Sequence, residues 1–281
     1  MIIFYSDGRL GNQIFQLAFL KEIAKANEKL VTFNLKKVLL TFDVNFKVNN
    51  IEIENRIWRF ISRRIFFYFF ELLSLLRIIT IICEDYDRVE YNKKPGLFWF
   101  ISYVRTGFFQ SEKFFKADNF LSSIKLKDRY INKANDFLIN VPDKFTKIFI
   151  HVRRGDYLTE VYLDKKGINL PLSYYKKAIS LVSEKIDNPY YIILSDDNDF
   201  VEAAFNDLEN KIISPNSSEV DLAVMSLCDG GIVSNSSYSW WGAFLIKNKK
   251  IVVMPKYWLG WKSKTQSHKG INLAFADIID F

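Results

Sequence analysis

Short apolar runs alternate with segments of helical periodicity along most of this chain. The run Ile2–Tyr5 predicts a buried strand, and a glycine-containing turn follows it. The next apolar residues recur every three or four positions, which places them on one face of a helix; they are Phe15, Phe19, Ile23 and Ala26. A second strand is predicted at residues 29–34, so the chain opens with a β-α-β unit.

The second half of the chain repeats this alternation. The pattern predicts strands at residues 147–150, 190–194, 212–213, 231–233 and 251–254, with helices at 173–186, 199–208, 220–227 and 239–245. Strands that alternate with helices are typical of a parallel sheet. A polar helical segment at 132–140 ends at Pro142, which we take as the linker. We therefore predict an α/β fold of two Rossmann-type domains, residues 1–142 and 143–281, that face a central cleft.

Residues 56–83 hold three apolar runs that only Glu71 and Arg77 interrupt. None reaches the roughly 18 residues that a membrane-spanning helix needs. Four arginines precede or begin these runs, at positions 56, 59, 63 and 64, so the segment is predicted to form one or two basic amphipathic helices. Two interpretations stay open: a helix pair in the core, or a helix that lies on a membrane surface.

The composition sets limits on partners and compartment. The net charge of +7 would suit nucleic acid, anionic lipid or a phosphorylated substrate, but the basic residues are scattered and form no recognised nucleic-acid-binding motif. The two cysteines, Cys83 and Cys228, lie far apart in apolar runs, which favours free thiols and a reducing compartment. The amino terminus has no basic segment before its short apolar run, so we expect no signal peptide.

The segment from His151 to Tyr157 carries the densest candidate chemistry. It follows an apolar strand and contains an imidazole, the guanidinium groups of Arg153 and Arg154, and the carboxylate of Asp156. Ligands of α/β sheets bind at the carboxyl ends of strands, and arginine forks match the geometry of phosphate groups. This block predicts a site for a pyrophosphate-bearing ligand.

Two further blocks follow predicted strands. In the block Ser195-Asp196-Asp197, the two aspartates offer carboxylates that could accept hydrogen bonds from a guanine base, although an aspartate here could instead cap the next helix. Asp197 and Asp199 also form an Asp-x-Asp triplet, an alternative metal site. In residues 234–237, serine hydroxyls stand at a helix start, where they could bind an anion or merely cap the helix.

Together with a fourth block, Gly8-Arg-Leu-Gly-Asn-Gln-Ile-Phe-Gln at residues 8–16, these motifs resemble the α-1,2-fucosyltransferases of glycosyltransferase family eleven. Residues 107–112 and 220–226 also fit the family pattern, whereas residues 40–100 are the least recognisable part. The family usually has a second glycine where Arg9 stands. The resemblance implies a GT-B-like fold and inverting transfer of L-fucose from GDP-fucose to the 2-hydroxyl of galactose.

The resemblance also implies roles for individual residues. Arg153 is carried over as the diphosphate clamp beside Arg154, with Ser236 and Ser237 as phosphate donors. His151 and Asp197, with Asp196 as the alternative carboxylate, are expected to contact guanine. Arg9, Asn12 and Gln13 are expected to contact the sugar from the amino-terminal domain, which receives the acceptor.

The base that activates the acceptor is expected to be Asp156, or Glu160 in its place, because an inverting enzyme needs one carboxylate near the acceptor hydroxyl. The arginine and serine groups would stabilise the departing GDP, so we expect no metal and no cofactor. The expected partners are GDP-fucose and a galactose-terminated glycan, which could be lipid-linked in a bacterial cell; nucleic acid is not expected as a partner. The enzyme is expected to be cytoplasmic or peripheral at the inner membrane.

Overall fold

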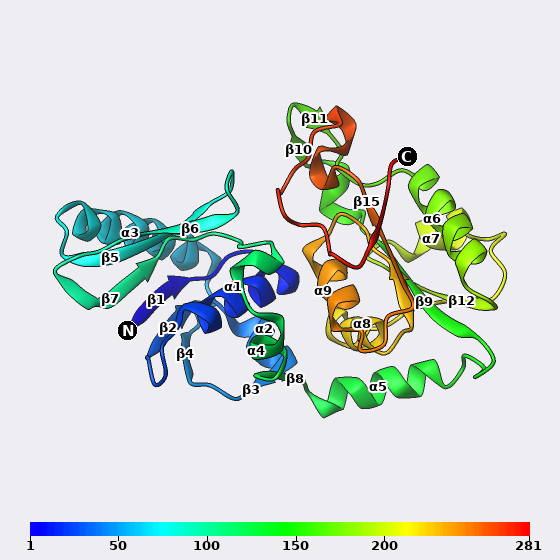
Figure 1. The fold of residues 1–281 in the computed structure, drawn as a ribbon, viewed down its shortest axis with the longest axis horizontal. Coiled ribbons are helices and arrows are strands. Elements are labelled where there is room, and N and C mark those ends of the chain that lie inside the picture. Colours follow the sequence, from blue (N-terminus) through cyan, green and yellow to red (C-terminus); the bar gives the residue numbers. More distant parts are fainter. The chain divides into compact units, whose positions relative to one another are not determined.

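The computed structural model describes residues 1–281 and divides into two compact α/β units, Met1–Lys125 and Leu126–Phe281 (Figure 1). Each unit is built on a six-stranded sheet that is wholly or mainly parallel. The predicted fold class, two Rossmann-type α/β domains, is therefore confirmed.

The sheet of the first unit has the strand order β4-β2-β1-β7-β5-β6. The predicted β-α-β opening is present as β1 (Ile2–Tyr5), α1 (Leu10–Ile23) and β2 (Leu30–Phe33), and β1 pairs with β2 in parallel. The remaining strands are β4 (Val48–Ile51), β5 (Ile79–Asp85), β6 (Glu90–Lys94) and β7 (Phe98–Val104). Only β6 runs antiparallel, against β5. Ala26, predicted on the helix face, lies beyond the end of α1.

Smaller elements complete this unit. They are α2 (Lys36–Thr41), η1 (Glu112–Phe114), α4 (Ala117–Leu121) and a two-stranded pair of β3 (Phe42–Val44) and β8 (Ile124–Leu126), whose last residue belongs to the second unit. The tight turn before α1 uses Gly8, whose positive φ of 86° suits a residue without a side chain.

The segment predicted as a core helix pair or an interfacial helix is one helix, α3 (Arg56–Leu75). Phe70 is its only buried residue, and it packs against Ile79, Ile81 and Tyr103 of the sheet. The expectation of a core helix pair is therefore wrong. The apolar residues outnumber the positions that one sheet face can cover, so most of them remain exposed. No helix of the structure is both long enough and apolar enough to cross a bilayer.

The sheet of the second unit has the order β13-β12-β9-β14-β15-β16, and every neighbouring pair is parallel. Its strands are β9 (Thr146–Val152), β12 (Pro189–Ser195), β13 (Lys211–Ile213), β14 (Gly230–Ile232), β15 (Ile251–Pro255) and β16 (Asp277–Ile279). Its helices are α5 (Asp128–Leu138), α6 (Leu172–Lys185), α7 (Asn198–Ala204), α8 (Ser218–Ser226) and α9 (Ser237–Leu245). All the strands and helices predicted for this half are present, within a few residues of their expected ends.

Four features of the second unit differ from the sequence prediction. Helix α5 belongs to this unit because it packs against α8, so the division falls at residue 125 and not at the predicted 142. The hairpin of β10 (Val161–Tyr162) and β11 (Lys165–Lys166), the 3-10 helix η3 (Trp258–Ser263) and strand β16 were not predicted. These segments are short and carry little hydrophobic periodicity. Both cysteines are free thiols, as expected.

Candidate functional site

Three neighbouring strands of the second unit end at one edge of the sheet, and each is followed by polar side chains. Strand β9 lies between β12 and β14, and all three run in the same direction. The 151–157, 195–197 and 234–237 blocks are therefore brought to a common edge, where α/β sheets bind their ligands. These three predicted blocks are far apart in the chain and adjacent in the fold.

Arg153 is held between two carboxylates at this edge. Its Nη1 lies 2.7 Å from Oδ2 of Asp196, and its Nη2 donates to Oδ1 of Asp156. The guanidinium carbon also lies 5.3 Å from the centre of the Tyr157 ring. Because two carboxylates and a ring fix the side chain, its donor groups are oriented before any ligand binds.

Asp196 and Gly155 fit closely around this arginine. Oδ1 of Asp196 accepts a hydrogen bond of 2.8 Å from the backbone N–H of Arg154, so one carboxylate fixes two consecutive residues of the loop. A Cβ atom at Gly155 would stand 2.4 Å from Oδ2 of Asp196, and the φ of Gly155 is positive. A side chain at position 155 would displace the carboxylate that holds Arg153.

Asp197 is the N-cap of α7. Its Oδ1 accepts from the backbone N–H of Phe200 at 3.1 Å, and its Oδ2 accepts from Nε of Arg154 at 2.8 Å. The Arg154 hydrogen bond, followed by the Phe200 N–H, lowers the pKa of the Asp197 carboxyl below its ordinary value. The capping role that the sequence left open is thus observed, and Arg154 itself stacks on the Phe200 ring at 3.5 Å.

His151 is buried at the end of β9. Its Nδ1 lies 2.8 Å from Oγ of Ser234, which in turn lies 3.2 Å from Oγ of Ser239. Burial lowers the pKa of His151 to about 4, with a small opposing contribution from Asp196. The imidazole is therefore neutral near neutral pH, and it can offer one donor and one acceptor but no positive charge.

The serine block lines the start of α9. Oγ of Ser236 accepts from the backbone N–H of Tyr238 at 3.4 Å, which makes Ser236 the N-cap, and Ser237 is the first residue of the helix. The preceding Asn235 was not singled out from the sequence. Its Nδ2 donates to the carbonyl of Ile168, while its buried Oδ1 accepts no hydrogen bond. A buried amide oxygen without a donor is rare and marks a position at which a ligand donor would be favourable.

The two candidate bases differ in their surroundings. Asp156 is the second residue of the 3-10 helix η2 (Gly155–Leu158). It is exposed, and its carboxylate forms an ion pair with Arg153. Glu160 is also exposed, and its backbone binds Asp156 and Gly167. Burial raises the pKa of the Tyr157 hydroxyl to about 12, and the negative charges of Asp156 and Glu160 contribute to the increase. Of the two carboxylates, that of Asp156 forms an ion pair with another predicted site residue, Arg153.

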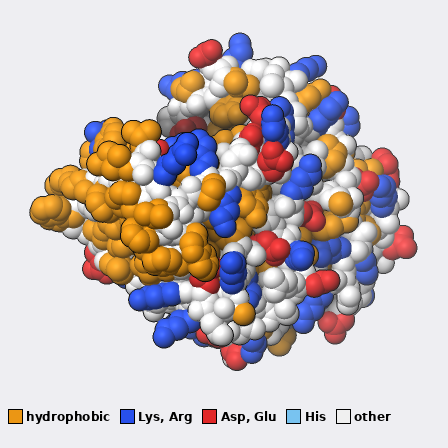
Figure 2. All heavy atoms as spheres, turned by 60° about the vertical axis from the view of Figure 1, so that its left-hand side comes forward, with side chains coloured by type: hydrophobic (Ala, Val, Ile, Leu, Met, Phe, Trp, Pro, Cys, Tyr) orange, Lys and Arg blue, Asp and Glu red, His pale blue; other side chains and the backbone are white.

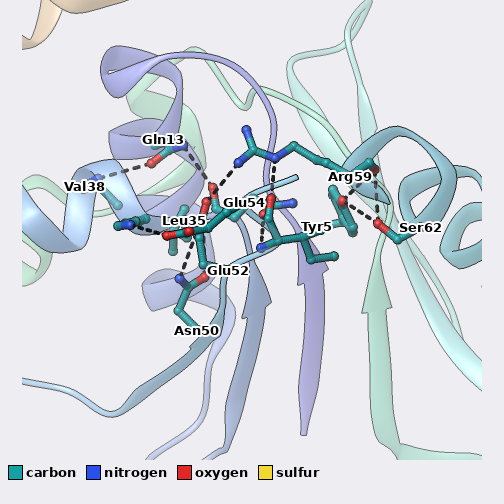
Figure 3. Close-up of polar contacts among 12 residues, drawn as sticks. Tyr5, Gln13, Leu35, Val38, Asn50, Glu52, Glu54, Arg59 and Ser62 are labelled. Carbon is teal, nitrogen blue, oxygen red and sulfur yellow. Dashed lines mark hydrogen bonds and ion pairs between the residues drawn. The ribbon is translucent and has the colours of Figure 1, made fainter. Parts of the chain in front are cut away.

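The predicted residues of the first unit lie at the start of α1. Gln13 is buried and works as a brace, since its Nε2 donates to the carbonyl of Asn34 and its Oε1 accepts from the N–H of Val38 (Figure 3). Asn12 accepts a hydrogen bond of 2.8 Å from Nε2 of Gln110. Arg9 is exposed and is the N-cap residue of α1, although its side chain makes no capping hydrogen bond.

Gln16 and Asp221 are buried polar residues that the sequence reasoning passed over within blocks it had noted. Gln16 accepts from Oγ of Ser6 and donates to the carbonyls of Asp7 and Gly107, so it ties the glycine turn to the 107–112 block. Asp221 of α8 accepts from Oγ of Ser214 at 2.5 Å. Burial raises the pKa of Asp221 to about 7, against the opposing effect of the Ser214 hydrogen bond.

We expect Asp221→Asn to change how stability depends on pH. The unfolded carboxyl has a pKa near 3.8, so between pH 4 and 7 the folded state binds more protons and its free energy of unfolding falls as pH rises. Asparagine does not titrate, so the variant lacks this fall in the free energy of unfolding, which is roughly 3 kcal/mol over the range. Urea unfolding at pH 5 and pH 7.5 measures it as the difference between variant and wild type. In that difference the opposite slope of the buried histidines cancels, and equal slopes in both proteins would refute the assignment.

No group of three or more histidine, cysteine, aspartate or glutamate side chains is arranged to hold a metal ion. Within the Asp-x-Asp triplet, the Asp197 oxygens bind Phe200 N–H and Arg154. Asp199 lies in the first turn of α7 and is exposed.

The sequence is similar to glycosyltransferases. The pattern of the family described as "Glycosyl transferase family 11" matches residues 1–272. The O-antigen biosynthesis glycosyltransferase WbnK of Escherichia coli is 34% identical over 166 residues, which cover 56% of this chain and 55% of WbnK. The alpha-1,2-colitosyltransferase of Escherichia coli is 28% identical, with 89% of this chain and 90% of that protein aligned. The chain spans about half the length of WbnK and nearly the whole colitosyltransferase.

Solved structures with the same fold include other glycosyltransferases. The glycosyl transferase family 9 protein from Veillonella parvula superposes with a TM-score of 0.53 and 11% identity, over 99% of this chain and 86% of that one. The fucosyltransferase NodZ from Bradyrhizobium gives 0.51 and 14% identity, over 87% and 92%. At these identities the likeness concerns the fold, which is GT-B-like.

Proposed function

This chain belongs to glycosyltransferase family 11, and we propose that, as a glycosyltransferase, it transfers L-fucose from GDP-fucose to the 2-hydroxyl of a galactose residue in a glycan, with inversion. The observation that carries the proposal is the meeting of the 151–157, 195–197 and 234–237 blocks at the carboxyl edge of three adjacent parallel strands. This edge gathers a fixed guanidinium, carboxylates and a helix amino terminus.

The diphosphate would bind to Arg153 and to the start of α9. Arg153 presents planar donors that two carboxylates already orient, and Ser236 and Ser237 stand at a helix amino terminus, where backbone N–H groups and the helix dipole favour an anion. A β-phosphate would compete with Asp156 for the Nη2 group of Arg153, while Asp196 keeps the guanidinium in place. Arg154 is turned to Asp197 and Phe200, so its role would be to support the loop.

The guanine base would be read by Asp197, with His151 nearby. A carboxylate can accept from both N1–H and the exocyclic amine of guanine, which adenine does not offer. Arg154 holds the pKa of Asp197 low, so the carboxylate is ionised and remains an acceptor. His151 is neutral and can exchange one hydrogen bond with the base without adding charge.

In the transfer step the 2-hydroxyl oxygen of galactose attacks C1 of fucose while the bond from C1 to the GDP oxygen breaks. The hydroxyl proton passes to a carboxylate, for which Asp156 is the first candidate and Glu160 the second. Negative charge grows on the leaving diphosphate, where Arg153 and the serines stabilise it. In the first unit, Arg9 and Asn12 are proposed to bind sugar, and Gln13 to hold their loop.

A second candidate is transfer of colitose. It is favoured by the likeness to an alpha-1,2-colitosyltransferase, which extends over 89% of this chain. Colitose is fucose without its 3-hydroxyl, so the two donors present the same GDP and differ at one hydroxyl. A direct comparison of kcat/KM for GDP-fucose and GDP-colitose separates the two candidates.

The proposed activity is tested by incubating the protein with GDP-fucose and a panel of acceptors: lactose, a lacto-type oligosaccharide and free galactose. The expected product carries fucose in α linkage on the galactose 2-hydroxyl, which NMR of the purified glycan identifies. A product with another linkage would contradict the proposed acceptor group. Failure to bind GDP by calorimetry would contradict the nucleotide site as well.

We expect transfer to proceed at its full rate in excess EDTA. The proposed phosphate contacts are a guanidinium and hydroxyl groups, which would stabilise the leaving GDP electrostatically without a metal. Initial rates are measured with EDTA, without it, and after adding Mn²⁺ or Mg²⁺. A rate that is lost in EDTA and recovered only with a divalent cation would replace this mechanism with one in which Asp197 and Asp199 bind metal.

A further inference from the structure

Helix α3 carries apolar residues on two opposite sides, and only one side is covered. Phe70 is buried on the sheet, with Phe66 and Leu73 packed beside it at helical spacing. The opposite side presents a second stripe at the same spacing: Ile57, Ile61, Ile65, Tyr68, Leu72 and Leu75, all exposed. A helix that is apolar all round is normally buried. The exposed stripe therefore calls for a partner.

The start of β7 extends this surface. The backbone N–H groups of Leu97 and Phe98 donate to the carbonyls of Arg77 and Ile78, which joins the strand to the segment that follows α3. Phe98, Trp99 and Phe100 are all exposed, with Trp99 at 69% of its surface. Figure 2 shows hydrophobic side chains covering much of this face of the first unit. We call this combined surface, the exposed stripe of α3 and residues 97–100, the apolar face.

Positive charge borders the apolar face. Helix α3 contains four arginines and a single acidic residue, Glu71, which is bound to Arg105 by two hydrogen bonds. Arg59 and Arg63 form ion pairs with Glu52 and Asp7, whereas Arg56 and Arg64 are exposed and Arg64 covers the Phe60 ring. Strand β6 adds Lys93 and Lys94, both exposed.

The helix is anchored firmly to its own unit, so its exposure does not come from a loose element. Asn55 caps α3 with hydrogen bonds to the N–H groups of Ile57 and Trp58. The hydroxyl of Tyr5, from the central strand β1, bonds to the carbonyl of Arg59 and lies 3.0 Å from Oγ of Ser62 (Figure 3). The exposed stripe is thus held at a fixed orientation on the sheet.

We propose that the apolar face docks onto the surface of a membrane rich in anionic lipid. An apolar stripe with aromatic residues and an arginine-rich border is the pattern of a helix that lies in the interface plane, with its side chains among the acyl chains and its cations at the headgroups. Like charges that border the face would oppose its pairing with a second copy of the same face. This contact is separate from the proposed nucleotide site, which lies in the second unit.

Vesicle flotation tests the proposal with the full chain. The wild-type protein is expected to float with vesicles of phosphatidylcholine and phosphatidylglycerol, and far less with phosphatidylcholine alone. The double variant Ile65→Glu, Leu72→Glu places two carboxylates on the stripe and is expected to stay at the bottom of the gradient. Ile139→Glu, at an apolar residue of the second unit that is even more exposed, serves as the control and is expected to float like wild type.

A second pair of substitutions tests the electrostatic part. Arg56→Gln with Arg64→Gln is expected to weaken binding to the anionic vesicles by roughly fivefold for each charge removed, and high salt should act in the same direction. Unchanged thermal unfolding would show that the variants are folded, as expected for exposed positions. Binding of the glutamate double variant at the wild-type level would overturn the proposal. A wild-type protein that does not bind anionic vesicles would also overturn it. If that protein instead forms dimers, and the glutamate double variant is monomeric, the apolar face pairs with a second copy of the chain and not with a membrane.

Discussion

Replacing Arg153 with lysine is expected to lower the rate of transfer about 100-fold or more, the usual cost of losing one donor to a developing negative charge. Nη1 and Nη2 of this arginine reach Asp196 and Asp156 at the same time. A lysine keeps the charge but has a single ammonium group, which cannot span both carboxylates and present a planar pair of donors to a phosphate. The effect should appear mainly in kcat, because the charge on GDP grows in the transition state.

Initial rates over a range of GDP-fucose concentrations measure this effect. Arg129→Lys provides a control, since Arg129 is an exposed arginine of α5, remote in sequence from the site blocks, whose guanidinium donates to the hydroxyl of Tyr130 and lies over its ring. The control should retain wild-type kinetics, and both variants should unfold near the wild-type temperature. Transfer by the Arg153 variant at a near-normal rate would remove Arg153 from the mechanism.

Substitutions at Asp197 are expected to reduce the preference for GDP over IDP, which lacks the exocyclic amine of guanine. In the wild type, IDP would leave part of the carboxylate without its donor, which costs roughly 10-fold or more in affinity. Asp197→Ala removes that acceptor and also the cap of α7. Asp197→Ser retains a capping oxygen and removes only the carboxylate.

The two Asp197 variants separate recognition from stability. Both should bind GDP and IDP with similar affinity in calorimetry, while only the alanine variant should lose about 1 kcal/mol of stability through the missing cap. Asp199→Ala, in the first turn of the same helix, should keep the wild-type ratio. If the serine variant still prefers GDP by the wild-type ratio, Asp197 serves only as a cap and Arg154 partner, and Asp196 becomes the residue to test.

The fold class could be predicted from the sequence because its signals are local. Strand β9 is centred on the apolar run Ile148–Ile150, and helix α6 of the second unit shows its buried face at a spacing of three or four residues. Polar residues that directly follow each apolar strand marked the carboxyl edge. In a parallel sheet, that local position is enough to bring His151, Asp197 and Ser236 to one side.

Other properties depended on contacts between residues distant in the chain. Helix α5 belongs to the second unit because it packs on α8, some ninety residues later, and no local pattern encodes that choice. Gln13 serves as a brace only because the ends of β2 and α2 present a carbonyl and an N–H to its side chain. The pKa of Asp221 near 7 likewise arises from burial by the surrounding fold.

The sequence by itself determined the α/β class, the glycosyltransferase family and the blocks that carry the candidate chemistry. Only the tertiary structure decided that Asp197 caps α7, that Arg153 rests between two carboxylates, and that α3 leaves an apolar stripe uncovered. The reason is physical. Periodicity shows which residues of one element are apolar, whereas burial and pairing depend on which other elements pack against it. The sheet of the first unit covers one face of α3 and leaves the opposite apolar face exposed.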